Sequence, residues 1–186
     1  GTMGLVQAES MAARFFHQLG ASLLDRTICA TAGAEGVTHT LGGKVGMRVG
    51  PITAAADRIT IRLHGPGGHT ARPHLTADLV HIAGRIICDL PAGFTKLTDL
   101  RDAPTLVFGM VQSGHAPNVI PSTAVLGATL RSQGRGTWDD APEIVERLLA
   151  SIIDPFGATW EMDYVRGSPP TDNDARATGV FADAAR

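Results

Sequence analysis

The chain has few of the features that mark a secreted, membrane or nucleic-acid-binding protein. It contains two cysteines, Cys29 and Cys88, and no charged-then-apolar leader, so we expect neither a disulfide framework nor secretion, and a cytoplasmic location. No apolar run approaches the roughly 20 residues of a membrane helix, which argues against membrane insertion. The 16 basic residues are balanced by 18 acidic ones, so charge does not favour nucleic acid or an anionic membrane as a partner.

What the chain does have is enough apolar content to fold. Hydrophobic residues make up 44% of 186 positions, which is sufficient for a core in one domain with extra segments, or in two small domains. Because the charge balance does not favour nucleic acid or an anionic membrane, small molecules or proteins remain as partners. Gly1-Thr2-Met3 resembles a cloning remnant, and we leave it out of the fold argument.

Hydrophobic periodicity predicts six elements between residues 55 and 166. Ile59, Ile61 and Leu63 alternate with polar residues, as in a strand with one buried face. Apolar residues then recur at three and four residue intervals, which predicts a helix from Thr76, as N-cap, to about Leu90, ended by Pro91. The later elements are strands at 105–112 and 123–131, a helix capped by Asp139 or Asp140 with Pro142 in its first turn, and a strand at 159–165.

This order predicts an α+β ferredoxin-like sandwich, in which a four-stranded antiparallel sheet carries two helices on one face. In the usual strand order the strand at 105–112 is an edge, and it is too apolar to stay uncovered. Pairing with a second chain would cover it, and a terminal segment of the same chain is the alternative. Outside the sandwich we expect a helix at 10–19, strands at 36–41 and 44–48, and a helix that begins after Asp172.

Five of the seven histidines lie within the predicted sandwich, and His69 stands out among them. It follows Gly67-Gly68 in a loop after a strand, where a side chain can project into a ligand space. A lone loop histidine is more often simply solvated. His69 and His74 could together bind metal, but no Cys, Asp or Glu lies near enough to complete a local zinc site.

A second candidate cluster is the loop at 113–121 with the strand that follows it. Asn118 offers a donor and an acceptor, and Arg131 can bind a carboxylate with two parallel hydrogen bonds. Together they suit an anionic ligand that carries an amide. The alternative is a turn asparagine and a strand-end arginine in water.

Several motifs in the right order resemble one family, the dinuclear-zinc aminoacylase, hippurate hydrolase and carboxypeptidase family of metal-dependent amidohydrolases and peptidases. The resemblance covers residues 43–173 and is carried by the runs 44–57, 65–74, 76–78, 118–121 and 169–174. It implies that residues 51–166 are a ferredoxin-like lid and dimerisation domain. Residues 1–50 would be a remnant of an α/β catalytic domain, and residues 167–186 the start of its returning segment.

The resemblance also implies roles for individual residues. His69 resembles the lid histidine that stabilises the oxyanion in the partner subunit's active site. Asn118 resembles the lid asparagine that contacts substrate, and Arg131 resembles an arginine that binds a substrate carboxylate. A homodimer, a small amide substrate such as an N-acyl amino acid, and zinc or another divalent metal in the full-length enzyme follow as expectations.

The chain departs from the family in its catalytic half. It has no His-Asp-Gly-His type run and no adjacent Glu-Glu pair, which would supply metal ligands and the general base. His39 is a weak candidate for a metal ligand. We therefore expect this chain to bind no metal and to be inactive alone. The rival hypothesis is a stand-alone dimerising binding module without catalysis; an RNA-binding domain is disfavoured by the missing basic surface and the few aromatic residues.

Overall fold

A computed structural model describes residues 28–31, 37–41 and 44–184 of the chain. The chain divides into two compact units. One, called here the sandwich unit, spans Ala54–Pro170. The other, the flanking unit, comprises the residues up to Thr53 together with those from Thr171 onward.

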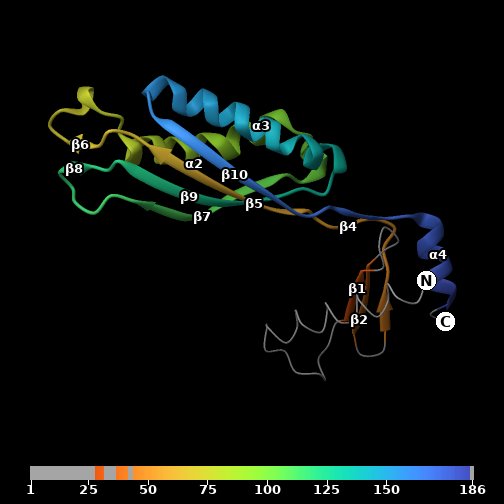
Figure 1. The fold of residues 1–186 in the computed structure, drawn as a ribbon. Helices are drawn as coiled ribbons and strands as arrows, with labels where there is room; N and C mark the ends of the chain where they lie inside the picture. Colours follow the sequence, from red (N-terminus) through yellow and green to blue (C-terminus); the bar gives the residue numbers. More distant parts are fainter. Residues whose placement is uncertain (1–27, 32–36, 42–43, 185–186) are drawn as a thin grey trace. The chain divides into compact units, whose positions relative to one another are not determined.

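The sandwich unit has the predicted ferredoxin-like architecture. Strands β5 (Ala56–His64), β7 (Thr105–Ser113), β9 (Thr123–Arg131) and β10 (Thr159–Ser168) form one antiparallel sheet in the order β10-β5-β9-β7. Helices α2 (Leu79–Leu97) and α3 (Arg135–Ile153) both cover the same face of this sheet (Figure 1). The α+β fold and the edge position of β7 are thereby confirmed.

The core lies between the sheet and the two helices. On β5 the alternation expected from the sequence is confirmed, because Ile59, Ile61 and Leu63 are fully buried while Arg58 and Arg62 are exposed. The buried face of β9 and the inner stripes of both helices complete the core. Full burial of each large apolar side chain contributes about 1.5–3 kcal/mol, so this layer supplies much of the stability of the unit.

Helix α2 differs from the prediction at both ends. Its N-cap is Asp78, whose Oδ1 accepts a hydrogen bond from the His81 N–H at 3.1 Å, and not Thr76. The expectation that Pro91 ends the helix was wrong, because the helix continues to Leu97. Phe94, in the turn after the proline, is fully buried, and its burial offsets the helix hydrogen bond that Pro91 cannot donate.

Helix α3 begins earlier than predicted. It starts at Arg135 with Gly134 as N-cap, so Asp139 and Asp140 lie inside the helix and do not cap it, and Pro142 lies beyond the first turn. Thr137 and Trp138 in the additional turn are both buried. Tertiary contacts of these two side chains therefore extend the helix upstream of its strongest local start signal.

The flanking unit contains the two expected strands at slightly shorter bounds, 37–41 and 44–46, together with three strands that were not predicted. Strands β1 (Ile28–Thr31), β2 (Val37–Leu41) and β3 (Lys44–Gly46) form an antiparallel sheet, β4 (Gly50–Thr53) pairs with β11 (Thr171–Asn173), and α4 spans Ala175–Ala184. The helix predicted at 10–19 lies outside the described residues. Among the residues that the structure describes, no helix is long and apolar enough to cross a bilayer.

Candidate functional site

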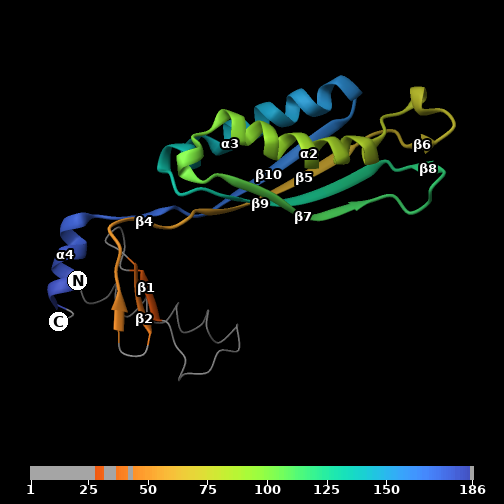
Figure 2. The same ribbon diagram turned by 180° about the vertical axis from the view of Figure 1, so that it is seen from behind.

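The two candidate loops meet at one end of the sandwich unit. Strand β6 (Gly68–His69) pairs with β8 (Val119–Ile120), so that His69 lies opposite Val119. The Thr70 N–H donates to the Asn118 carbonyl oxygen at 3.2 Å. Figure 2 shows this small ribbon beyond the end of the main sheet. His69 and Asn118, 49 positions apart in the sequence, are thus neighbours, and both are exposed.

Glycine makes this close approach possible. Gly67 has φ +65°, a conformation that L side chains rarely adopt, and a Cβ at this position would lie 3.2 Å from the Ile120 carbonyl oxygen. A side chain here would strain the backbone and push the two loops apart. The glycines before His69 therefore hold its loop against the segment that carries Asn118.

The His69 ring has a defined hydrogen bond on one side. Its Nδ1 lies 3.1 Å from the Ala71 backbone nitrogen, whose N–H donates to it. A backbone N–H can only donate, so Nδ1 of the neutral imidazole must be the acceptor and Nε2 must carry the proton. The exposed ring therefore offers an N–H donor to a ligand.

Among the described side chains, no other histidine joins His69 in a metal-binding group. His74, in the 3-10 turn Pro73–Leu75, and His115 are exposed, and His81 packs its ring edge-on against Phe156 with 5.4 Å between centroids. Within the described ranges there is no group of three or more His, Cys, Asp or Glu that could hold a metal ion. His39 lies in β2 opposite Cys29 and Gly46, and its side chain is not among those described.

Arg131 lies far from this loop end within one chain. It is the last residue of β9 and pairs with Thr105, whereas Thr123, at the other end of β9, pairs with His64. Eight residue steps at about 3.3 Å each separate the two ends by roughly 26 Å. Arg131 therefore cannot contact the same small ligand as His69 and Asn118 of its own chain.

Strand β7 presents an apolar edge. Its Val107, Val111 and Met110 are 61%, 48% and 39% exposed, respectively. The register shifts between Phe108 and Met110, so the strand bulges at Gly109. An apolar edge strand with one side unpaired is a ready template for another strand.

A buried carboxylate that the sequence did not single out lies near the opposite end of the sheet from His69. Asp57, on β5, is 2% exposed and accepts three hydrogen bonds, from Trp138 Nε1 at 3.0 Å, Tyr164 Oη at 2.7 Å and the Gly167 N–H at 2.8 Å. Burial, reinforced by the bond to Asp57, raises the pKa of Tyr164 well above its ordinary value. Tyr164 is therefore a permanent donor. The sequence does contain a signal for this site, because Asp57 is a charged residue that shares the inward-facing side of its strand with Ile59 and Ile61.

Comparisons with known proteins agree with the fold of the sandwich unit. Residues 54–156 match the model of the peptidase dimerisation domain. The N-acyl-L-amino acid amidohydrolase of Geobacillus stearothermophilus is 31% identical over 131 residues, which cover 70% of this chain and 35% of that protein. The crystal structure of the Bacillus subtilis YXEP protein, described as a dinuclear metal binding peptidase from the M20 family, matches with a TM-score of 0.58 and 26% identity, over 77% of this chain and 34% of that one.

A third match has a different kind of name. A Rhodococcus jostii protein named as a glutamate–cysteine ligase is 38% identical over 146 residues, which cover 78% of this chain but only 18% of that protein. The ligase name thus belongs to a protein of which more than four fifths lies outside the match. In all three cases the chain spans well under half the length of the protein it resembles.

Proposed function

Because the chain belongs to the M20 family of amidohydrolases and peptidases through its peptidase dimerisation domain, we propose that residues 51–166 form the dimerisation and substrate-capping domain of an enzyme that hydrolyses amide bonds. Its substrates are N-acyl amino acids or similar compounds, as the name of the Geobacillus relative suggests. The observation that carries this proposal is the juxtaposition of His69 and Asn118 on one exposed ribbon.

The proposed dimer pairs the two β7 strands antiparallel across a twofold axis. This arrangement covers the exposed Val107 and Val111 and makes one continuous eight-stranded sheet. It also reverses the ends of the second sheet relative to the first. The Thr105 end of one β7 then lies beside the Ser113 end of the other.

This reversal accounts for the distance between the candidate residues. Arg131 pairs with Thr105, and the His69 ribbon follows the end of the sheet where Ser113 pairs with Ala124. In an antiparallel pair, Arg131 of one copy therefore lies at the same end as His69 and Asn118 of the partner. We propose that Arg131 binds the substrate carboxylate, and that His69 and Asn118 act on the amide from the second copy.

The chemistry proposed for His69 is donation to an oxyanion. Its Nε2–H, fixed by the bond from Ala71 to Nδ1, can donate to the oxygen that becomes negative when water adds to the amide carbon. A preorganised donor of this kind contributes about 2.7–4 kcal/mol to the transition state. Asn118 can orient the same amide through its own amide group.

The metal site in this proposal belongs to the full-length protein. Zinc or another divalent metal is expected there by analogy with the dinuclear relative, but the described residues of this chain do not fit such a site, and no step here is derived through it. We propose that residues 1–50 and 167–186 are parts of the catalytic domain, that the 186-residue chain does not hydrolyse amides alone, and that it acts in the cytoplasm.

Light scattering coupled to size exclusion tests the dimer. We expect a dimer for the wild type and a monomer for Val107→Lys, because a lysine on the edge strand opposes strand pairing. Glu161→Lys, an exposed position on the opposite edge strand β10, is the matched control and should remain dimeric. A wild type that is monomeric at high concentration, or a Val107→Lys variant that stays dimeric, contradicts the proposed interface.

Hydrolysis assays separate the capping domain from a binding module that only dimerises. The chain alone, supplied with zinc, should release no product from N-acyl amino acids, and chelator-sensitive release would contradict this expectation. Mixed with a complementary catalytic fragment, the wild-type chain should restore hydrolysis and His69→Ala should not. Equal restoration by both proteins would favour the binding module.

A further inference from the structure

The connection between the two units is a two-stranded ribbon with a short break. On the flanking side, Thr53 of β4 pairs with Thr171 of β11. On the sandwich side, Ala56 of β5 pairs with Ser168 of β10. Two residues on each strand lie between these pairs, Ala54-Ala55 and Pro169-Pro170. We call these four residues the crossing.

The composition of the crossing explains why the ladder stops there. Pro169 and Pro170 have no backbone N–H and cannot donate to a neighbouring strand. On the opposite strand, the Ala55 N–H donates to the Ser132 carbonyl oxygen at 2.8 Å, so it is bonded inside the sandwich unit instead. The crossing is therefore the point where strand pairing between the two connecting segments is interrupted.

Asp57 holds the sandwich side of this break together. It lies two residues after Ala55, and its Oδ1 accepts from the Gly167 N–H, two residues before Pro169. The same Oδ1 accepts from Trp138 of α3, and Oδ2 accepts from Tyr164 of β10. One carboxylate thus ties both connecting strands and a helix at the base of the domain.

The contacts around Asp57 are close and specific. A Cβ on Gly167 would overlap the Ala56 carbonyl oxygen, so only glycine lets β10 approach β5 at this bulge. The guanidinium groups of Arg135 and Arg166 lie over the Trp138 ring, at 4.8 Å and 4.5 Å from its centroid, respectively. These stacked cations hold the indole so that its N–H meets the carboxylate.

We propose that Asp57 is a positioning residue that anchors the base of the sandwich unit and confines the hinge between the two units to the crossing. A carboxylate suits this position because it accepts all three hydrogen bonds and needs no donor of its own. With Asp57 in place, β5 and β10 move as one body up to Ala56 and Ser168.

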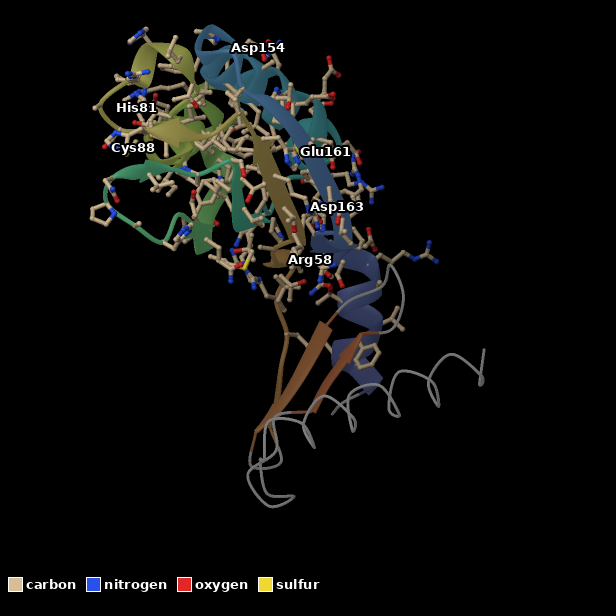
Figure 3. The ribbon with its side chains drawn as sticks, turned by 60° about the vertical axis from the view of Figure 1, so that its left-hand side comes forward. Arg58, His81, Cys88, Asp154, Glu161 and Asp163 are labelled. Atoms are coloured by element: carbon tan, nitrogen blue, oxygen red, sulfur yellow. The ribbon has the colours of Figure 1, made fainter. Side chains whose placement is uncertain are left out.

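Hydrogen exchange tests the anchor without reference to activity. In Asp57→Asn we expect the amides of residues 55–58 and 165–168 to exchange at least tenfold faster than in the wild type, with little change across the β7–β9 pair. Tyr164→Phe, which removes one donor and keeps the carboxylate, should show the same pattern more weakly. Asp163→Asn is the control, because the side chain of this exposed neighbour of Tyr164, labelled in Figure 3, forms no hydrogen bond or ion pair within the described part of the chain.

Nitrogen-15 relaxation tests the hinge. In the wild type, the heteronuclear NOE should dip at Ala54 and recover by Asp57 and Val165; in Asp57→Asn the dip should extend to Asp57 and Gly167. Uniformly faster exchange in all four strands of Asp57→Asn and of Tyr164→Phe would mean that Asp57 only stabilises the fold, and would overturn the proposal. Unchanged exchange in both variants, or no dip at the crossing, would overturn it as well. These outcomes do not depend on whether the chain dimerises or caps a substrate.

Discussion

The Thr137 hydroxyl donates to Asp102 Oδ2 at 2.6 Å and joins two segments that are 35 positions apart in the sequence. The N-cap of α3, Gly134, has no side chain to offer, and the carboxyl group of Asp102 occupies the space where a Cβ of Gly134 would lie. The Gln133 N–H also donates to the Asp102 carbonyl oxygen, at 2.7 Å. The carboxylate of Asp102, from the 3-10 turn Leu100–Asp102 that precedes β7, therefore lies at the first turn of α3, where its negative charge favours a helix N-terminus.

Removing this carboxylate should destabilise the domain. Asp102→Ala leaves the Thr137 hydroxyl without its acceptor and the helix without its anion, so we expect the free energy of unfolding to fall by about 1–2 kcal/mol. Urea unfolding followed by circular dichroism measures this change. Asp140→Ala, an exposed position within α3, should change it by less than about 0.5 kcal/mol. Equal losses in the two variants would show that the Asp102 carboxylate does not stabilise the first turn of α3.

The helix starts show what local sequence could and could not predict. Asp139, Asp140 and Pro142 form a strong local start signal, yet the helix begins earlier because distant groups stabilise its first turn: Asp102 binds Thr137, and Asp57 binds Trp138. No pattern within ten residues carries that information. The alternation on β5 and β9 was readable because it depends only on the two faces of a strand.

The same contrast holds for the candidate site. Glycines around His69 indicated an exposed loop, which the structure confirms. That Asn118 lies beside His69 while Arg131 lies at the other end of the sheet follows from strand order and register, which the residues themselves do not encode locally. Local sequence did not indicate the role of Asp57, because its partners come from α3 and from β10 with its bulge, all more than 80 positions away.

Replacing the prolines that lie inside the two long helices should stabilise the protein. Pro91 lies within α2 and Pro142 within α3, and each lacks the N–H that would bond to the carbonyl four residues earlier. We expect Pro91→Ala and Pro142→Ala each to raise the free energy of unfolding, by roughly 1–3 kcal/mol. Pro104→Ala, outside the helices, should lower it slightly because the unfolded chain gains freedom. Thermal and urea unfolding measure these changes. A lower free energy of unfolding in the two helix variants than in the wild type would contradict the expectation.

Asp99 should titrate far below an ordinary aspartate. Arg101 Nη2 lies 2.6 Å from Asp99 Oδ2, and the Arg101 N–H donates to Oδ1 at 2.9 Å. The side-chain bond, followed by the backbone bond, lowers the pKa of Asp99 from 3.8 to about 2. The pKa of Asp99 in the folded protein thus lies below its value in the unfolded chain, near 3.8. The interaction of Asp99 with Arg101 therefore stabilises the fold fully above pH 3.8, and this stabilisation is lost as the pH falls through about 2.

Carbon-13 NMR of the Asp99 carboxyl measures this midpoint directly. Arg101→Gln should raise the midpoint toward 3.8, because it removes the charged donor. Lys96→Gln removes an exposed charge that has no contact with Asp99 and serves as the control. A midpoint that is the same in the wild type and in Arg101→Gln would show that the ion pair does not persist in solution, as is common for exposed pairs.

The tautomer of His69 should depend on a single backbone donor. With the Ala71 N–H bonded to Nδ1 at 3.1 Å, nitrogen-15 spectra at about pH 8, where an ordinary imidazole is neutral, should show His69 more completely in the Nε2–H form than His74. Ala71→Pro removes the donor and should bring the two residues to the same tautomer ratio, whereas Ala71→Gly keeps the N–H and should leave His69 unchanged. If Ala71→Pro also lowers restored hydrolysis in the fragment assay while Ala71→Gly does not, the Nε2–H is the group that acts on substrate. An Ala71→Pro variant with unaltered His69 spectra would show that the bond to Nδ1 does not set the tautomer.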